Sequence, residues 1–526
     1  MSGMNNSLET VHLEEKKRRL LQYLLEEESI GRSTVEKIPA RDPADSTPLS
    51  FAQQRLWLVN QIVDDDSAYN ISTAIHLQGQ LDVPALEDSF NELVRRHEVL
   101  RTTFAVVDGQ PSQVISAKEL LDLPAIDLSM LTQQAADGLA ERLTVEDALR
   151  PFSLDRWPLI RTALVVPGRG EHVLTFSMHH IVSDGWSLGI LKSEIAALYA
   201  AFSSGLPSAL PELPIQYADF AVWSRGWLEG PAAAADLDYW KNRLQGELPT
   251  IEMPTDQARP VVQTFQGDSV TIVLPGTLAN SQRALCRRDG ATLFMVLLAA
   301  FKLLVYRYTG QHDLIVGTPI ANRNRQELEP LIGFFLNTLV LRTDLSGNPS
   351  FRELLARVRD VALGAYSHQD IPFEMLVEEL KPSRDLGRPP LFQLMFNMLN
   401  VAEEAFSLPG LSIADIDLQE TKSKFDLTLY AAEQGEELRL TAVYSTSVLH
   451  RDTVERMLEH LRTLLLNASR DPDQPIQMLA LENLDRLKPV SARSAMEAGS
   501  FRCVESKPYA PQSIWDRFTA QVEKHP

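Results

Sequence analysis

Two adjacent histidines and a nearby aspartate are the residues of this chain best suited to chemistry. They lie in the segment His179-His180-Ile181-Val182-Ser183-Asp184-Gly185, which follows a strand-like apolar run, residues 172–178, and precedes a predicted helix, residues 188–202. Imidazole exchanges protons near neutral pH, so this segment is the predicted centre of acid–base chemistry. Because side chains alternate along a strand, His179 and His180 should face opposite ways. We therefore expect one of the two histidines to act on a substrate and the other to belong to the scaffold.

The same residue types could also bind a metal ion. Two histidines and an aspartate are a common ligand set. However, adjacent histidines on a strand diverge, and no cluster of further carboxylates or cysteines is found nearby in the sequence. Proton transfer or positioning is therefore favoured over metal binding.

The elements that must position this segment mix strands and helices. Turn-forming residues 167–170 join two strand-like runs, which predicts a β-hairpin, and residues 83–97 predict a helix. Beyond residue 254 the pattern continues with similar content. Strands are predicted there over residues 269–274, 313–319, 334–343, 391–397 and 438–444, and helices over 278–288, 293–309, 350–367, 373–380 and 452–469. This mixture predicts an α+β fold with two halves.

Composition excludes several functional classes. The chain has 526 residues, of which 44% are hydrophobic, enough for more than one core. Its net charge of -20 argues against binding nucleic acid or an anionic membrane. The two cysteines, Cys286 and Cys503, are far apart, which favours a reducing cytoplasm. The most apolar run, residues 292–304, contains Lys302 and predicts a buried helix rather than a membrane span.

The N-terminal region has its own pattern. Leucines at 13, 20, 21, 24 and 25 predict an amphipathic helix over residues 13–28, either packed on its own domain or docking onto another protein. Residues 1–30 form this N-terminal helical segment, for which both roles, packing and docking, stay open. The prolines of residues 31–48 indicate a linker.

Seven motifs in order resemble the condensation domains of nonribosomal peptide synthetases. The resemblance covers about residues 49–479, and its third motif is the His-His-x-x-x-Asp-Gly segment. The other six motifs are Leu-Ser-Phe-Ala-Gln-Gln-Arg-Leu-Trp at 49–57, Arg-His-Glu-Val-Leu-Arg at 96–101, Tyr-Ala-Asp-Phe-Ala-Val-Trp at 217–223, Ile-Gly-Phe-Phe-Leu-Asn-Thr at 332–338, His-Gln-Asp-Ile-Pro-Phe at 368–373 and Arg-Pro-Pro-Leu-Phe-Gln at 388–393.

The resemblance implies a fold and a reaction. Two lobes similar to chloramphenicol acetyltransferase, here residues 49–228 and 229–485, would form a V-shaped pseudodimer with a central tunnel. The amine of an acceptor aminoacyl thioester would attack a donor acyl or peptidyl thioester, and an amide would form. No bound cofactor is implied, because both substrates arrive on the 4'-phosphopantetheine arms of carrier proteins. An upstream synthase would dock through the N-terminal helix, and residues 486–526 resemble a linker and the start of a downstream adenylation domain.

The resemblance also implies site residues. His179, His180, Asp184 and Gly185 form the predicted catalytic set, in which His180 is either a general base or a positioning group. Asp184 is regarded as structural within the family. A buried carboxylate needs a cationic partner, and we predict Arg96 first, with Arg101 and Arg323 as alternatives.

Smaller roles are predicted around this set. Gly185 could adopt a turn with positive φ and offer a backbone N–H to an oxyanion, and Ser187 could cap the following helix. Asn337 could bind an intermediate or pantetheine, or instead make a hydrogen bond within the protein. Trp223, predicted mainly as a core residue, is the remaining candidate for substrate contact.

Two alternative functions stay open at this point. Epimerisation domains carry the same His-His-x-x-x-Asp-Gly signature, although residues 67–71 and 337–342 are more similar to condensation domains that join two L-configured partners. A catalytically silent platform that binds carrier proteins is the second alternative. The presence of His180 and Asp184 argues against it.

Overall fold

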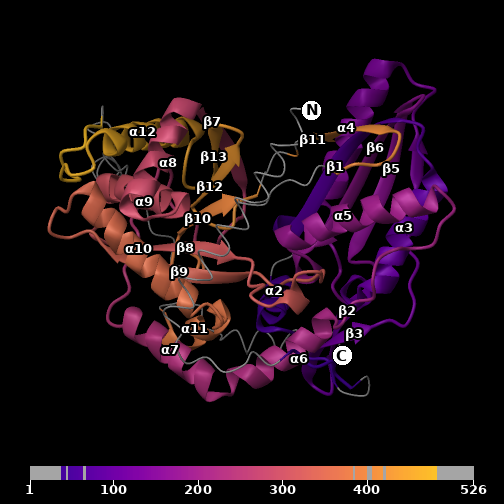
Figure 1. Ribbon diagram of the computed structural model, residues 1–526, viewed down its shortest axis with the longest axis horizontal. Helices are drawn as coiled ribbons and strands as arrows, with labels where there is room; N and C mark the ends of the chain where they lie inside the picture. The colour runs from indigo at the N-terminus through magenta and orange to yellow at the C-terminus, as the bar shows by residue number, and fades with distance from the viewer. Residues whose placement is uncertain are drawn as a thin grey trace, which may run out of the picture.

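The computed structural model describes residues 37–42, 46–62, 67–382, 385–399, 406–416, 418 and 422–481. Two lobes, each built on its own sheet, lean away from one another and meet at their base, so that the molecule has the shape of a V (Figure 1). The predicted N-terminal helix, residues 13–28, and the predicted adenylation-domain start, residues 486–526, lie outside the described residues.

The first lobe is a five-stranded sheet covered on both faces by helices. Its strand order is β11-β1-β6-β5-β4, and every pairing is antiparallel except β4 with β5. The strands are β1 (Asn70–Gly79), β4 (Ala125–Asp127), β5 (Ile160–Gly168), β6 (Glu171–His179) and β11 (Leu411–Ile416). The helices of this lobe are α2 (Phe51–Ile62), α3 (Val83–Arg96), α4 (Gln133–Leu149), α5 (Gly185–Phe202) and α6 (Tyr217–Leu228). A separate hairpin pairs β2 (Thr102–Val107) with β3 (Gln110–Ile115).

Alternation along β6 explains why helices cover both faces of this sheet. Leu174, Phe176 and Met178 are buried in the main core of the lobe, with residues of α3 and α5. Val173, on the opposite face, packs in a smaller cluster with Ala140 of α4. The predicted hairpin of β5 and β6 is thus confirmed, and its second strand carries the motif to the edge of the core.

The second lobe is a six-stranded sheet with helices packed against it. Its strand order is β7-β13-β12-β10-β8-β9, with parallel pairing of β10 to both β12 and β8. The strands are β7 (Gly267–Leu274), β8 (Asp313–Ile320), β9 (Asn337–Asp344), β10 (Leu394–Leu399), β12 (Leu427–Gln434) and β13 (Glu437–Ser445). The helices are α7 (Pro231–Arg243), α8 (Gly276–Asp289), α9 (Leu293–Thr309), α10 (Phe351–Ser367), α11 (Phe373–Leu380) and α12 (Arg451–Arg470).

The apolar run with Lys302 is the buried helix that the sequence predicts. Helix α9 has buried residues on all sides, and Lys302 Nζ donates to Leu341 O at 2.7 Å and to Thr343 Oγ1 at 2.6 Å. Burial lowers the pKa of Lys302 to about 7. Within the described residues no single helix is long and apolar enough to cross a membrane; α8 and α9 pass such a test only as a pair, and they are bent by 106°.

Two segments from the second half of the chain pack onto the first lobe. Strand β11 pairs with β1 as the edge of the first sheet, where Ala74 lies opposite Ile416 (Figure 1). The connection between β8 and β9, residues 321–336, is called the crossover loop below. It buries Leu331, Ile332 and Phe335 in the core of the first lobe. The lobes are therefore joined through shared sheet and shared core.

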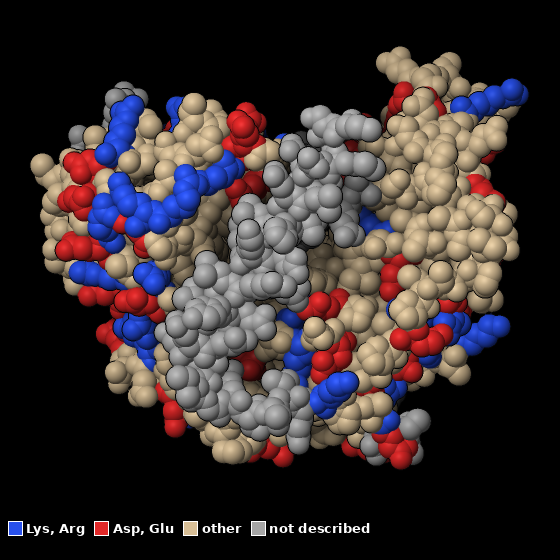
Figure 2. Space-filling view, in the orientation of Figure 1, with Lys and Arg blue, Asp and Glu red and all other residues tan. Residues whose placement is uncertain are grey.

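The described surface carries both signs of charge. Figure 2 shows lysine and arginine side chains interspersed with aspartate and glutamate on this face of the two lobes. The charge distribution on this face therefore does not indicate the kind of binding partner.

Candidate active site

His180 lies at the point where strand β6 ends. The strand ends at His179, and His180 begins a short 3-10 turn, His180–Val182. The predicted alternation of the two histidines assumed that both lie on the strand, which is not the case. Its Nδ1 lies 3.2 Å from the carbonyl oxygen of Ser183. Because a carbonyl oxygen can only accept, Nδ1 carries the proton and Nε2 keeps its lone pair. No described residue makes a hydrogen bond to that Nε2.

The surroundings of His180 keep it neutral. Burial, followed by the positive charge of Lys424 and by His179, lowers the pKa of His180 well below 6.5. The ring of Phe334, from the crossover loop, packs edge-on at 5.5 Å from its ring centre. At physiological pH the imidazole is thus uncharged and able to accept a proton or a hydrogen bond.

His179 has a different environment. It is 1% exposed and packs against the rings of Tyr69 and Phe152, at 6.5 and 6.2 Å between ring centres. Its Nδ1 accepts a hydrogen bond from the Ile181 N–H at 3.0 Å. His179 therefore fixes the turn that carries His180, which is a scaffold position although the resemblance includes His179 in the catalytic set.

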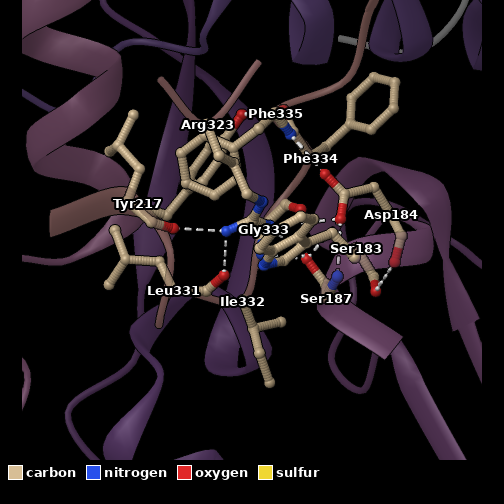
Figure 3. A network of polar contacts seen from close by, with 12 residues as sticks. Ser183, Asp184, Ser187, Tyr217, Arg323, Leu331, Ile332, Gly333, Phe334 and Phe335 are labelled. Carbon is tan, nitrogen blue, oxygen red and sulfur yellow. Dashed lines mark hydrogen bonds and ion pairs between the residues drawn. The ribbon is translucent and has the colours of Figure 1, made fainter. Parts of the chain in front are cut away.

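Asp184 is the N-cap of helix α5 and is almost completely buried. Its Oδ1 accepts from the backbone N–H of Ser187 at 2.8 Å and from Arg323 Nη2 at 3.2 Å. Its Oδ2 accepts from the Phe335 N–H at 3.0 Å. Figure 3 shows the carboxylate turned toward Ser187, Arg323 and the crossover loop. Asp184 thus joins the first lobe to the crossover loop and is not a hydrogen-bond partner of His180.

Arg323 is the cationic partner of Asp184. Besides the carboxylate it contacts Ser187 Oγ at 2.8 Å, and it donates to the carbonyls of Leu328 and Leu331, each at 2.6 Å. Its side chain is 1% exposed. Burial lowers its pKa, and the Asp184 carboxylate opposes that change. Arg323, the last of the three arginines predicted as partners of Asp184, is therefore the one that pairs with it.

The prediction that Arg96 pairs with Asp184 is wrong. Arg96 Nε contacts both carboxylate oxygens of Glu194, in the middle of α5, at 3.0 and 3.2 Å. His97 Nε2 lies 2.9 Å from the same carboxylate, and burial lowers the pKa of His97. Helix α3 runs beside α5, so Arg96 reaches the nearer carboxylate.

Arg101 is not a partner of Asp184 either. It contacts Glu98 at 3.5 Å and donates to the carbonyl of Ser116, at the end of the β2–β3 hairpin. Glu194 was missed, although its position between Leu191, Ile195 and Leu198 places it on the buried face of a helix.

Ser187 does not have its predicted role as a helix cap, and Gly185 does not have the predicted positive φ. Asp184, not Ser187, caps the helix. Ser187 Oγ instead lies 2.8 Å from the Gly333 carbonyl and 3.1 Å from the Gly333 N–H, so it ties α5 to the crossover loop. Gly185 is the first residue of α5 and is not among the residues with positive φ. A Cβ placed on Gly185 would meet no atom within 4 Å, so there is open space beside it.

Tyr217 holds the crossover loop from the opposite side. Its hydroxyl lies 2.6 Å from Phe334 O and 2.8 Å from Ser50 Oγ. A Cβ on Gly333 would come within 2.0 Å of the Tyr217 ring, so only glycine permits this approach. The first, fourth and fifth motifs thus meet at Phe334, directly beside His180. Tyr217 is part of a motif in the sequence, but the sequence alone predicts no role for it.

The amide of Asn337 is fully occupied within the protein. Nδ2 donates to Gln369 O at 2.9 Å and to Ile371 O at 2.8 Å, and Oδ1 accepts from the N–H groups of Thr338 and Phe373. Of its two predicted roles, the internal hydrogen bond is therefore the one observed. Trp223 is half-buried and stacks under Arg325 at 4.4 Å. The side chains of Trp223 and Arg325 line a pocket at the junction of the lobes.

A metal centre has no candidate among the described residues. Within them, no group of three or more His, Cys, Asp or Glu side chains is arranged to hold a metal ion. His179 and His180 use their Nδ1 atoms in separate backbone hydrogen bonds.

Comparison with known proteins places this site in a family. The model of the family described as "Condensation domain" matches residues 44–484. The chain belongs to the condensation-domain family of nonribosomal peptide synthetases. The reaction of such condensation domains is the formation of a C–N amide bond.

Relatives and solved structures agree with this assignment. A linear gramicidin synthase protein of Brevibacillus parabrevis is 49% identical over 438 residues, which are 83% of this chain and 8% of that relative. A surfactin synthase protein of Bacillus subtilis is 40% identical over 82% of this chain and 12% of its own length. The chain thus spans about a tenth of these relatives. The X-domain from teicoplanin biosynthesis has a TM-score of 0.78 at 27% identity, covering 85% of this chain and all of that one.

Proposed function

We propose that this condensation domain joins the amine of an acceptor aminoacyl-S-carrier to a donor acyl or peptidyl thioester beside His180. The observation that carries the proposal is the state of that imidazole. Its Nδ1–H is held by Ser183 O, and its Nε2 lone pair is available in a ring whose pKa is well below 6.5. A group of this kind can accept a proton during the reaction at physiological pH.

The protein does not need to remove a proton from most of the acceptor amine before the amine attacks. A free α-amine has a pKa of about 8, and the electron-poor thioester carbonyl beside it lowers that value, so much of the amine is already neutral. Its nitrogen attacks the donor carbonyl carbon, which gives a tetrahedral species with N⁺ and O⁻. His180 Nε2 then accepts the proton from nitrogen or holds the amine in position. The C–S bond breaks, the donor thiol leaves with the proton, and the amide remains on the acceptor carrier.

The start of helix α5 is suited to stabilising the oxyanion. The first N–H groups of a helix lack acceptors within the helix, and the helix dipole is positive there. Asp184 occupies the Ser187 N–H of this turn. The open space beside Gly185, one residue after the cap, leaves room for a thioester carbonyl to approach. We assign the Gly185 backbone, and no side chain, to this role.

Partners follow from the same reaction. Donor and acceptor carrier proteins with phosphopantetheine arms would deliver the two thioesters. An upstream synthase would reach the domain through residues 1–30, and an adenylation domain would begin within residues 486–526. The cytoplasmic location predicted from cysteine usage also stays a prediction.

A non-catalytic platform is the second candidate. One solved relative of similar fold is a complex of the X-domain and OxyB from teicoplanin biosynthesis, with a TM-score of 0.77 at 27% identity. That X-domain thus binds a protein partner in the solved complex. The available Nε2 of His180 favours catalysis for the present chain.

The test is a condensation assay followed by intact-protein mass spectrometry. Donor-loaded and aminoacyl-loaded carrier proteins are mixed with the wild-type chain in D₂O. Amide on the acceptor carrier supports the proposal. Deuterium at the α-carbon without amide would instead indicate epimerisation, and carrier binding without either product would favour the platform.

A further inference from the structure

The side chain of Lys424 reaches from the second lobe to the first beside the proposed reaction site. Its Nζ lies over the ring of Tyr69, 4.7 Å from the ring centre, which is the arrangement of a cation–π interaction. Tyr69 directly precedes β1, and its ring centre lies 6.5 Å from that of His179. The ammonium group is therefore held one aromatic ring away from the turn that carries His180.

The backbone around Lys424 is fixed by the second lobe. Its carbonyl oxygen accepts a hydrogen bond from Gln263 Nε2 at 2.7 Å. Two residues later, the buried carboxylate of Asp426 accepts hydrogen bonds from both terminal nitrogens of Arg259, and β12 begins at the next residue. Lys424 is thus placed from both lobes, by its backbone in the second and by the Tyr69 ring in the first.

Lys424 is the main source of positive charge at the His180 imidazole. Burial is the first cause of the lowered pKa of His180, and the charges of Lys424, His179 and Arg55 add to it in that order. Arg55 forms an ion pair with Glu374 at 3.2 Å, so an acidic group offsets part of its charge. A substitution that removes the Lys424 charge should therefore change the imidazole more than a similar change elsewhere.

We propose that Lys424 is a positioning residue for the reaction, seated on Tyr69, through which the second lobe brings a positive charge to His180. This inference rests on the proposed function. Before attack, the charge opposes protonation of the imidazole, so Nε2 stays available as an acceptor. As the C–N bond forms and the C–S bond breaks, the proton passes from the amine nitrogen to Nε2 and then to the departing sulfur. A positive neighbour favours the second transfer, because it disfavours the protonated imidazole.

Lys424→Met tests this role, because methionine keeps much of the length of the side chain and carries no charge. With less positive charge nearby, the imidazole takes up a proton at a higher pH, so the variant should lose activity sooner on acidification. In single-turnover amide formation, the ratio of the rate at pH 5.5 to the rate at pH 7.5 should be at least about threefold lower than in wild type, the effect of a shift of about half a pH unit. Protonation of the acceptor amine is common to both proteins and cancels in this comparison.

Three further variants separate the charge from other effects. Lys424→Gln, a second neutral variant, should lower the ratio as Lys424→Met does. Lys424→Arg keeps a cation that can rest on the Tyr69 ring, so its ratio should lie within about twofold of wild type. Lys422→Met is the matched control, because it removes the same charge two residues earlier from a side chain that is not among the charges acting on His180. It should leave the ratio unchanged.

The proposal is overturned if the neutral variants keep the wild-type ratio or are slowed by the same factor at both pH values. A purely structural role would give the second result, because lost packing does not depend on the protonation of His180. An equal shift in Lys422→Met, or a Lys424→Arg variant as sensitive to acid as Lys424→Met, would also overturn it. In these cases the condensation function stands. Absence of amide with the wild-type chain would instead overturn that function, and this inference with it.

Discussion

Helix α5 carries two buried carboxylates with arginine partners, and the two pairs connect different parts of the molecule. Asp184, at the start of the helix, pairs with Arg323 of the crossover loop. Glu194, in the middle of the helix, pairs with Arg96 and His97 of the first lobe. The first pair therefore helps join the lobes beside the reaction site, whereas the second mainly holds α3 against α5. A buried carboxylate–arginine pair thus helps assemble the site at Asp184 and holds two helices of one lobe together at Glu194.

The largest effect is expected from breaking the first pair. Arg323→Ala leaves the Asp184 carboxylate buried without its cation and removes donors to Leu328 O and Leu331 O. Removing one partner of a buried pair costs about 3–5 kcal/mol. Urea unfolding should show a loss of this size.

The control for Arg323→Ala is an ion pair nearer the surface. Arg342 and Asp313 lie 2.7 Å apart with side chains 20% and 39% exposed, so Arg342→Ala should cost about 1 kcal/mol or less through the ion pair. If Arg323→Ala costs no more than Arg342→Ala, the tie between the lobes contributes little to stability.

A smaller and more local effect is expected at the second pair. Glu194→Gln keeps the shape of the side chain but removes the charge that Arg96 faces, which should cost about 2–3 kcal/mol. Hydrogen exchange should increase mainly in α3 and α5. Arg323→Ala should instead increase exchange mainly in the crossover loop. The same exchange pattern in both variants would contradict the division drawn between the two pairs.

The smallest effect concerns pH. Burial lowers the pKa of His97 in the folded protein below its ordinary value of 6.5. As pH falls through 6.5 the unfolded chain takes up this proton first, so stability decreases on acidification. One such group contributes at most about 1.4 kcal/mol per pH unit. His97→Gln should flatten the slope of unfolding free energy between pH 6.5 and 5 relative to wild type, and an unchanged slope would show that His97 does not titrate there.

Much of the fold follows from local patterns in the sequence. The β5–β6 hairpin and the buried helix α9 were predicted because turn residues and continuous apolar runs are strong signals. Helix α4 was missed, since it buries small residues, Ala136, Ala140 and Thr144, and so has a weak apolar pattern. Strand β11 was missed because it is an edge strand with no fully buried residue, and its partner β1 is distant in sequence.

The site shows the same division between local and distant information. The motif itself located His180, and the local turn explains its orientation. The partner of Asp184 depends on how the crossover loop enters the first lobe, which no local pattern encodes. Arg96 is the first partner predicted for Asp184, yet α3 places its side chain against Glu194. The sequence leaves both roles of Asn337 open, and the turn at residues 369–373 decides between them because it occupies the amide.

The most direct test compares His180→Gln with Asp184→Asn in two measurements, single-turnover amide formation between loaded carriers and urea unfolding. We predict that His180→Gln slows amide formation by a factor of about 10²–10⁴ with an unfolding midpoint close to wild type. Asp184→Asn should mainly lower the midpoint. If His180→Gln forms amide at the wild-type rate, His180 is neither the base nor the positioning group, and the central claim is wrong.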